Sequence, residues 1–509
     1  MSTAHRVIKN TGFLYGKMAI TMFISLYTTR LVLNALGASD FGIFNVVGGA
    51  IAMLGFLHAA MSSATQRFMS FYEGKGDKEK QKYIFNVSSV LHFGIAIGLV
   101  LVLLVAGYFF FNGILNIPAD RMFAAKVIYG SLILSTAFTV MSVPYEAVLN
   151  AHENMLYYSI VGIIESLLKL AVALIIVYHA GDKLVLYGIL MAVIPFITRT
   201  IMQVYCHNKY VECVIAPKKY FEKSLMKEMT SFAGWSFLGT TISMITNYGQ
   251  GIVLNMFFGT IVNAAQGIAN QINGQLMVFS SSMLKALNPA IVKKEGSGER
   301  QNMLNMAITG GKFSFALLAF FAVPVIIEMP FILRLWLKNV PEYTIIFCRL
   351  LLVKTIIEQM VITLSTSISA TGQIKQYQIT ISLMAIIPLV TTYGFFYLGF
   401  QPWVLYVVYI IHVSIRSFVV TVFFANQLCA LNVKDFLLNV ISKEAIILVF
   451  AALLPVILHY KMEIGFYRAL LIVMAYMVSF SLLFYFLNLT AKEKGIIHTL
   501  VQRVIKVKS

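Results

Sequence analysis

Long apolar stretches separated by short polar segments repeat along the whole chain. Fourteen of these stretches hold about 20 residues each, the length that an α-helix needs to cross the hydrocarbon core of a membrane. The pattern therefore predicts a bundle of about fourteen transmembrane helices joined by short connections. The expected helices lie near 12–34, 41–65, 84–110, 123–148, 157–178, 184–206, 232–256, 263–290, 304–327, 344–368, 378–398, 403–425, 443–460 and 466–488.

The composition agrees with a chain that lies mainly in lipid. Hydrophobic residues make up 59% of the 509 residues and charged residues only 12%, whereas soluble domains have about 45–50% apolar and about 25% charged residues. An ordinary soluble enzyme, a disordered chain and a secreted disulfide scaffold are excluded. The fold class is an all-α polytopic membrane protein. The four cysteines show no metal-ligand spacing, so we expect free thiols, no metal and no cofactor.

The positive net charge of +18 is explained by membrane topology rather than by nucleic acid. If the N-terminus is cytoplasmic, the cytoplasmic segments hold 23 Lys and Arg residues and the opposite segments hold six. Cytoplasmic loops of membrane proteins carry such an excess. We therefore expect both termini inside and no nucleic-acid partner.

A short internal repeat divides the chain. Residues 31–34 read LVLN and are followed by Gly37, and residues 252–255 read IVLN and are followed by Gly259. Two six-helix halves with the same orientation, and a site between them, are expected from such a repeat. The expected organisation is an N-lobe at 1–206, a cytoplasmic linker at 207–231, a C-lobe at 232–425, and two further helices with a basic tail at 426–509.

Leaving out Lys443, Glu444 and Arg468, at the first residues of the last two expected spans, basic residues inside the spans outnumber acidic ones by ten to three. A charge at the centre of a membrane costs at least about 2.5–3.5 kcal/mol, so such residues normally face a cavity or a partner. The alternative for those near helix ends, Arg30 among them, is that they reach the headgroups. The candidates for a cationic cavity are Arg30, Lys17, Lys312, Arg349, Lys354 and Arg416.

Two acid–base pairs lie four residues apart on their helices and so share a face. Glu165 precedes Lys169, and Lys354 precedes Glu358. One interpretation is a pair that only lowers the cost of insertion. The other is an ion-linked switch, which makes Glu165, Lys169 and Glu358 the ion-coupling candidates.

Amides and hydroxyls form polar stripes on two consecutive expected helices, at 232–256 and 263–290. Hydrogen bonds between packed helices would explain one or two of them. Two stripes in succession favour the walls of a wet cavity, and amides both donate to and accept from sugar hydroxyls. The candidate sugar-binding residues are Asn247, Gln250, Gln266, Asn270 and Asn273.

Several stretches resemble polysaccharide flippases of the O-antigen (Wzx) type, in the multidrug/oligosaccharidyl-lipid/polysaccharide (MOP) exporter superfamily. The longest is TTRLVLNALGASDFGIFNVVGGAIAMLGFLHAAMSSATQRF at 28–68. The others are YEAVLNAHENM at 145–155, LNMFFGTIVNAAQGIANQING at 254–274 and ALNPAIVKKEGSGE at 286–299. No phosphate-binding loop, nucleophile elbow or HExxH motif is present, so an enzyme is not expected.

The resemblance implies two six-helix lobes around a central cavity in the bacterial inner membrane. It also implies flipping of undecaprenyl-pyrophosphate-linked oligosaccharide to the periplasmic leaflet, coupled to a proton or sodium gradient. The expected partners are this lipid-linked oligosaccharide, membrane lipids and the coupling ion, with the protein acting as a monomer. The alternatives are a multidrug/cation antiporter of the same superfamily and a membrane-bound polysaccharide polymerase. The first would favour acids in the cavity, and the second would need a large catalytic loop.

Overall fold

The computed structural model describes residues 3–52, 55–114, 117–337, 340–491 and 493–495, and every element in these ranges is helical. Ten of the helical segments in the described part are long and apolar enough to cross a membrane. The expected all-α, multi-pass membrane fold is confirmed. The expected spans near 41–65, 232–256, 263–290 and 344–368 are not among these ten.

The reasons for this difference are visible in the helices themselves. The spans near 232–256 and 263–290 lie on either side of a break at Gly259 in one long helical segment, and both carry the polar stripes. The span near 344–368 is interrupted between Gln359 and Ile362. Residues 53–54, within the span near 41–65, lie outside the described residues.

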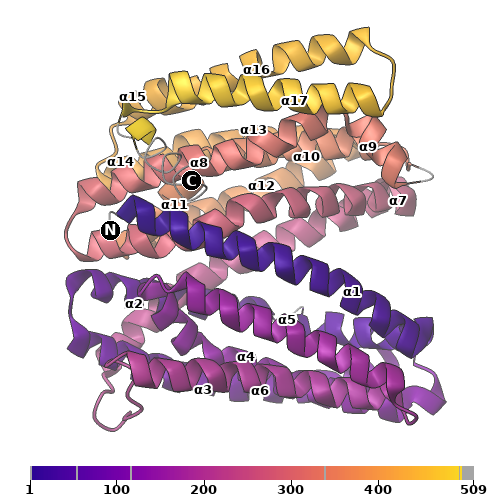
Figure 1. Cartoon of the computed structure of the whole chain (residues 1–509), viewed down its shortest axis with the longest axis vertical. Helices are drawn as coiled ribbons and strands as arrows, with labels where there is room; N and C mark the ends of the chain where they lie inside the picture. Colours follow the sequence, from indigo (N-terminus) through magenta and orange to yellow (C-terminus); the bar gives the residue numbers. More distant parts are fainter. Residues whose placement is uncertain (1–2, 53–54, 115–116, 338–339, 492, 496–509) are drawn as a thin grey trace, which may run out of the picture. The chain divides into compact units, whose positions relative to one another are not determined.

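The helices of the first part of the chain are drawn from indigo to purple in Figure 1. They are α1 (Thr3–Ala52), α2 (Gly55–Lys75), α3 (Lys78–Phe109), α4 (Met122–Ala151), α5 (Met155–Tyr178) and α6 (Lys183–Lys209), with short turns η1 (Phe110–Ile114) and η2 (Ala119–Arg121).

The helices that follow run from magenta to yellow in Figure 1. They are α7 (Lys223–Gly296), α8 (Arg300–Ile327), α9 (Met329–Trp336), α10 (Thr344–Gln359), α11 (Ile362–Thr371), α12 (Lys375–Tyr397), α13 (Val404–Ile415), α14 (Val422–Cys429), α15 (Val433–Phe436), α16 (Ser442–Lys461) and α17 (Phe466–Leu483), with π-helical turns η3 (Arg416–Thr421), η4 (Leu437–Ile441) and η5 (Phe484–Asn488).

Two glycines bend the two longest helices in the same way. Gly37 in α1 has φ 78° and ψ 168°, and Gly259 in α7 has φ 76° and ψ −170°. Only glycine adopts this region without a steric cost. The two positions follow the LVLN and IVLN sequences, so the repeat seen in the sequence is also present in the backbone.

Close contacts divide the chain into two compact units. The N-terminal unit contains Ile8–Thr240 and Val292–Gly298. The C-terminal unit contains the described residues up to Val7, Thr241–Ile291 and the described residues from Glu299 onward. The middle of α7 thus belongs to the C-terminal unit, while its beginning and its end belong to the N-terminal unit.

The N-terminal unit is built around α4, which packs against α2, α3 and α6. Buried aliphatic side chains such as Leu103, Ile128 and Leu184 fill one part of its core. Shortly after the bend at Gly37 in α1, Asp40 binds the Arg121 guanidinium, with Oδ1 2.8 Å from Nε. The same guanidinium binds Asp182, with Nη1 3.0 Å from Oδ2. This shared arginine joins α1, η2 and the start of α6.

The C-terminal unit has one large apolar core that runs from α7 to α17. Phe315, Phe347, Tyr406 and Tyr476 are among its fully buried side chains. Helices α16 and α17 lie side by side and also pack on α8. Their outer faces expose many large apolar residues, as expected for helices that meet lipid.

Candidate functional site

The break at Gly259 shapes a polar cavity within the C-terminal unit. A cavity of about 600 Å³ lies along α7 on both sides of this residue. The described residues that line it are Asn247, Tyr248, Gly251, Ile252, Asn255, Met256, Asn263, Gln266, Gly267 and Asn270. Five of the ten lining side chains are amides, and no acid is among them.

Glycine at 251 allows the two polar stripes to face each other. A Cβ atom at this position would lie 3.2 Å from Gln266 Oε1 and 3.4 Å from Asn263 Oδ1. The side-chain oxygens from beyond the break therefore reach the backbone of the segment before it. Three of the five predicted sugar-binding residues, Asn247, Gln266 and Asn270, line this cavity.

Helical spacing explains which residues the sequence analysis missed. Asn247, Gly251 and Asn255 are four residues apart, so they share a face that differs slightly from the predicted one. Asn255 lines the cavity, whereas Gln250 and Asn273 are not among the described lining residues. The four-residue spacing on the polar helix could have identified Asn255.

A group of three charged side chains in the same unit keeps a net positive charge. Glu358 Oε2 lies 3.2 Å from Lys354 Nζ, and its other oxygen pairs with the Arg416 guanidinium. The three side chains are between 24% and 30% exposed. Two cations and one carboxylate leave one positive charge that an anionic group could approach.

Lys312 and Arg349 have internal roles in this structure. Lys312 is buried, and its Nζ lies 2.9 Å from Glu493 Oε2 and 2.9 Å from the carbonyl oxygen of Asn488. The Arg349 Nε donates to the carbonyl of Ile326 at 2.9 Å, near the end of α8, where carbonyl groups lack helical partners. Both groups hold helix ends in place, so we leave them out of the binding set below.

The N-terminal unit places the remaining candidates on α1 and α5. The Lys17 ammonium lies 4.4 Å from the centre of the Tyr158 ring, which is a cation–π contact, and it passes over Gly162. Lys169 Nζ binds Glu165 Oε1 at 2.6 Å, and both side chains are 42% exposed. Arg30 is exposed on α1.

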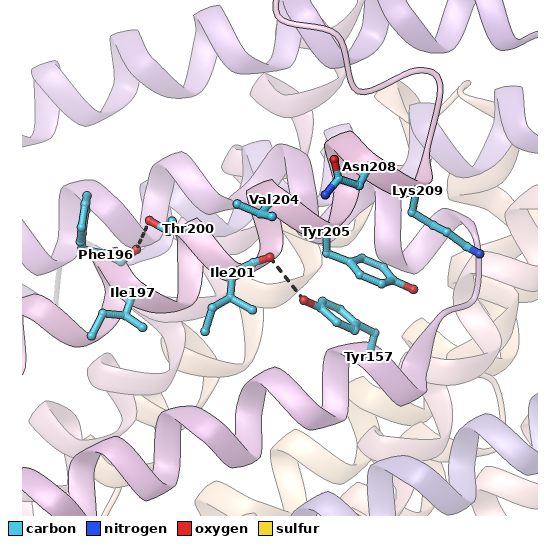
Figure 2. A pocket seen from close by; sticks show the side chains of 9 residues that line it. All are labelled: Tyr157, Phe196, Ile197, Thr200, Ile201, Val204, Tyr205, Asn208 and Lys209. Carbon is cyan, nitrogen blue, oxygen red and sulfur yellow. Dashed lines mark hydrogen bonds between the residues drawn. The ribbon is translucent and has the colours of Figure 1, made fainter.

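A second groove, between α5 and α6, has a different chemistry. Figure 2 shows Tyr157 stacked on Tyr205, with ring centres 3.6 Å apart, near one end of the groove. Phe196, Ile197, Ile201 and Val204 continue the lining. Its volume is about 610 Å³. The lining is mostly apolar, so this groove suits a hydrocarbon chain better than a sugar.

Solved structures with the same architecture define the class of protein. A MOP-superfamily transporter from Pyrococcus furiosus has a TM-score of 0.69, with 15% identity, over 85% of this chain and 96% of its own. A multidrug resistance MATE-family transporter in an outward-facing conformation has a TM-score of 0.70, with 14% identity, over 84% of this chain and 96% of its own. A MATE protein in a bent conformation has a TM-score of 0.72, with 15% identity, over 84% of this chain and 96% of its own. The chain is a multi-pass membrane protein with the fold of MOP-superfamily transporters.

The sequence match is more specific than the fold. Residues 7–294 match the polysaccharide biosynthesis protein family, and the chain belongs to this family. The uncharacterized membrane protein EpsK of Bacillus subtilis is 20% identical over 308 residues, which cover 59% of this chain. The match also spans 59% of the length of that relative. The resemblance to a polysaccharide biosynthesis family is confirmed, and the fold is the one that MOP-superfamily transporters share.

Proposed function

We propose that this protein flips undecaprenyl-pyrophosphate-linked oligosaccharide repeat units from the cytoplasmic to the periplasmic leaflet of the bacterial inner membrane. The observation that carries the proposal is the amide-lined cavity on α7, in a chain of the polysaccharide biosynthesis family. Amides match sugar hydroxyls because each amide both donates and accepts hydrogen bonds.

The charged end of the substrate needs a different partner. The group of Lys354, Glu358 and Arg416 keeps one net positive charge and is partly exposed. A guanidinium binds phosphate in a bidentate manner, and an ammonium acts as a point charge. We assign the pyrophosphate to this group and the sugars to the cavity. The polyprenyl chain stays in lipid.

Transport proceeds by alternating access in this proposal and is coupled to a proton or sodium gradient. Glu165 with Lys169, and Glu358, are the coupling candidates within the membrane. Each acid is paired with a base, at 2.6 Å for Glu165 and at 3.2 Å for Glu358 with Lys354, so binding of an ion to the acid would release the base. The protein acts as a monomer, with both termini in the cytoplasm.

The multidrug/cation antiporter is the second candidate because MATE transporters share the fold. A cationic drug favours acids at its binding site. The cavity on α7 has amides and no acid among its described lining residues. Its chemistry therefore favours a neutral, hydroxyl-rich ligand over an organic cation.

Complementation tests the proposal. A strain that lacks the chain should accumulate lipid-linked repeat units on the inner leaflet and lose surface polysaccharide, and the wild-type chain should restore both. Drug resistance should not change between the two strains. Normal glycan display without the chain, or a change in drug resistance alone, would overturn the proposal in favour of the antiporter.

A further inference from the structure

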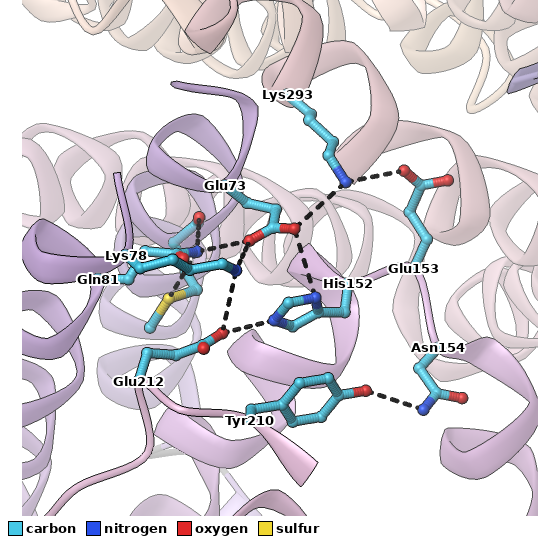
Figure 3. Close-up of polar contacts among 10 residues, drawn as sticks. Glu73, Lys78, Gln81, His152, Glu153, Asn154, Tyr210, Glu212 and Lys293 are labelled. Carbon is cyan, nitrogen blue, oxygen red and sulfur yellow. Dashed lines mark hydrogen bonds and ion pairs between the residues drawn. The ribbon is translucent and has the colours of Figure 1, made fainter. Parts of the chain in front are cut away.

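Six charged or titratable side chains meet at one end of the N-terminal unit. Lys78 is the first residue of a helical segment that is apolar enough to span a membrane, and the other five lie outside such segments. Figure 3 shows them converging from five parts of the chain. They come from the end of α2, the start of α3, the α4–α5 connection, the segment after α6 and the end of α7. We call them the His152 cluster: Glu73, Lys78, His152, Glu153, Glu212 and Lys293.

The imidazole of His152 lies between two carboxylates. Its Nε2 is 2.5 Å from Glu212 Oε1, and its Nδ1 is 3.4 Å from Glu73 Oε1. The ring stacks on Tyr210, with ring centres 4.1 Å apart and planes 12° apart. The Glu212 side chain is 1% exposed and the Glu73 side chain 13%, so water cannot easily replace the contacts of either.

Counting donors shows how many protons this arrangement needs. An ionised carboxylate only accepts hydrogen bonds, and a neutral imidazole donates from one nitrogen only. Both nitrogens of His152 face a carboxylate oxygen, so both contacts are favourable only with one proton more than a neutral imidazole carries. The arrangement is that of an imidazolium ion between two carboxylates.

The charges next to the ring also favour an imidazolium. Three carboxylates, those of Glu73, Glu153 and Glu212, face the ammonium groups of Lys78 and Lys293. An imidazolium supplies the third positive charge. The titratable groups facing the ring are Glu73 from α2, Lys78 from α3, and Tyr210 and Glu212 from the segment after α6; Glu153 and Lys293 lie one contact further.

The carboxylates themselves stay ionised. Burial raises the pKa of Glu73, but the hydrogen bond from Lys78 and the charges of His152, Lys78 and Lys293 outweigh burial, so its pKa is lowered. Burial also raises the pKa of Glu212, and the hydrogen bond and charge of His152 outweigh it, so that pKa is lowered too. Both carboxylates therefore act as hydrogen-bond acceptors toward the imidazole.

The cluster also fixes the end of α7. A Cβ at Gly74 would lie 1.9 Å from the carbonyl oxygen of Lys293, and a Cβ at Gly296 would lie 1.9 Å from that of Phe71. The ends of α2 and α7 thus meet backbone to backbone through two glycines. Next to this contact, Lys293 Nζ lies 3.7 Å from Glu73 and 3.6 Å from Glu153.

Glu153 is held in an unusual conformation for this contact. Its φ is 56°, in the left-handed region that non-glycine residues rarely adopt. Its carbonyl oxygen accepts a hydrogen bond of 2.8 Å from the Asn10 side chain. The strained turn directs a buried carboxylate toward Lys293, so the turn after α4 and the end of α7 depend on each other.

We propose that the His152 cluster is a proton-binding site, and that the bound proton keeps the end of α7 attached to α2 and to the α4–α5 connection. Loss of the proton leaves a lone pair of the imidazole facing a carboxylate. Glu73 then separates from His152, and the ion pair between Glu73 and Lys293 at the end of α7 weakens. The consequence for transport rests on the proposed function, because α7 also carries the amide-lined cavity. The proton site itself does not depend on the function.

The donor atoms of Glu73, His152 and Glu212 lie within 4.8 Å of one another, which is also close enough for a metal ion. We assign the site to a proton because a carboxylate oxygen lies at each ring nitrogen; a metal ion would take one nitrogen while the other donates to its carboxylate, and the experiment below separates the two. Lys78 Nζ, at 2.5 Å from Glu73 Oε2, already provides a positive charge beside that carboxylate.

Two measurements on the full chain in lipid nanodiscs test the proposal. The first follows the titration of histidine ¹⁵N signals and assigns His152 by its loss in H152Q. The second measures the distance between spin labels at K75C and S297C, two exposed positions at the ends of α2 and α7, between pH 5.5 and pH 8.5. Labelling uses short reaction times because the four native cysteines are buried.

We expect an imidazolium signal from His152 at pH 5.5 and a single short distance that broadens as the signal is lost. H152Q should remove the pH dependence of the distance, and H179Q, at the end of α5, should leave it unchanged. A neutral His152 at pH 5.5, or a distance that ignores pH, overturns the proposal. A distance that responds to added Zn²⁺ or to EDTA, and not to pH, also overturns it in favour of a metal site. Failure of complementation with a normal titration would overturn only the function.

Discussion

The amide-lined cavity on α7 and the His152 cluster differ in what their polar side chains contact. The amides on α7 surround a cavity of about 600 Å³, whereas the charged groups around His152 contact one another directly, with the side chains of Glu212 and Glu153 only 1% exposed. Polar groups that line open space can exchange water for a ligand. Polar groups that satisfy each other hold a conformation. The first region is therefore the place for a substrate, and the second is the place where the state of the protein is set.

The buried pair of Lys312 and Glu493 belongs with the second kind of region and gives the largest expected effect. Lys312→Met leaves the Glu493 carboxylate buried without its cation, which costs about 3–5 kcal/mol. We expect a large loss of thermal stability in detergent. The double variant Lys312→Met with Glu493→Gln should recover most of it. A single variant that is stable but does not transport would place Lys312 at the substrate instead.

The contact between α2 and α7 should be nearly as sensitive. In Gly74→Ala the new Cβ meets a backbone oxygen at 1.9 Å, and overpacking costs about 1–3 kcal/mol. We expect the upper end, about 3 kcal/mol, because neither partner is a flexible side chain. The spin-label distance at the ends of α2 and α7 should lengthen. Gly94→Ala, where no atom lies within 4 Å of the new Cβ, is the matched control and should change nothing.

The charged group on α10 and η3 tests whether its residual charge serves a ligand. Arg416→Gln leaves Glu358 paired with Lys354, so stability should change little. A charge-assisted hydrogen bond to the substrate is worth about 1.5–3 kcal/mol, which corresponds to about 10–100-fold weaker transport in a vesicle flipping assay. Arg334→Gln, at another exposed arginine, should have no effect. Equal loss in both variants would argue against a specific phosphate contact.

The sequence predicted the fold better than it predicted the contacts of the charges. Apolar stretches identify membrane helices because, in lipid, the backbone N–H and C=O groups must form hydrogen bonds with one another, as they do in a helix. The glycines at 37 and 259 could be paired from the LVLN and IVLN sequences alone. The amide stripes located the cavity because helical spacing is local, although the selected face differed enough to include Gln250 and omit Asn255.

The partners of individual charges could not be predicted because they come from distant segments. Lys312 is paired with Glu493, which lies beyond the last expected helix and so was not counted among the intramembrane acids. His152 lies between the expected helices at 123–148 and 157–178, and nothing near it in the sequence indicates that Glu73 and Glu212 approach it. Only packing brings these segments together, and periodicity carries no information about it.

The smallest effects are expected in the amide-lined cavity, where each side chain contributes one contact among several. Asn270→Ala removes a single neutral hydrogen bond to a sugar hydroxyl, worth about 0.5–1.5 kcal/mol, or about 2–10-fold in transport. Gln271→Ala changes a neighbouring exposed amide that is not among the described lining residues and should have no effect. Adding Asn247→Ala to Asn270→Ala should multiply the losses if both amides contact sugar independently. If neither variant changes transport while both fold normally, the cavity is a packing defect at the Gly259 break, and the distinction between the two polar regions loses its functional meaning.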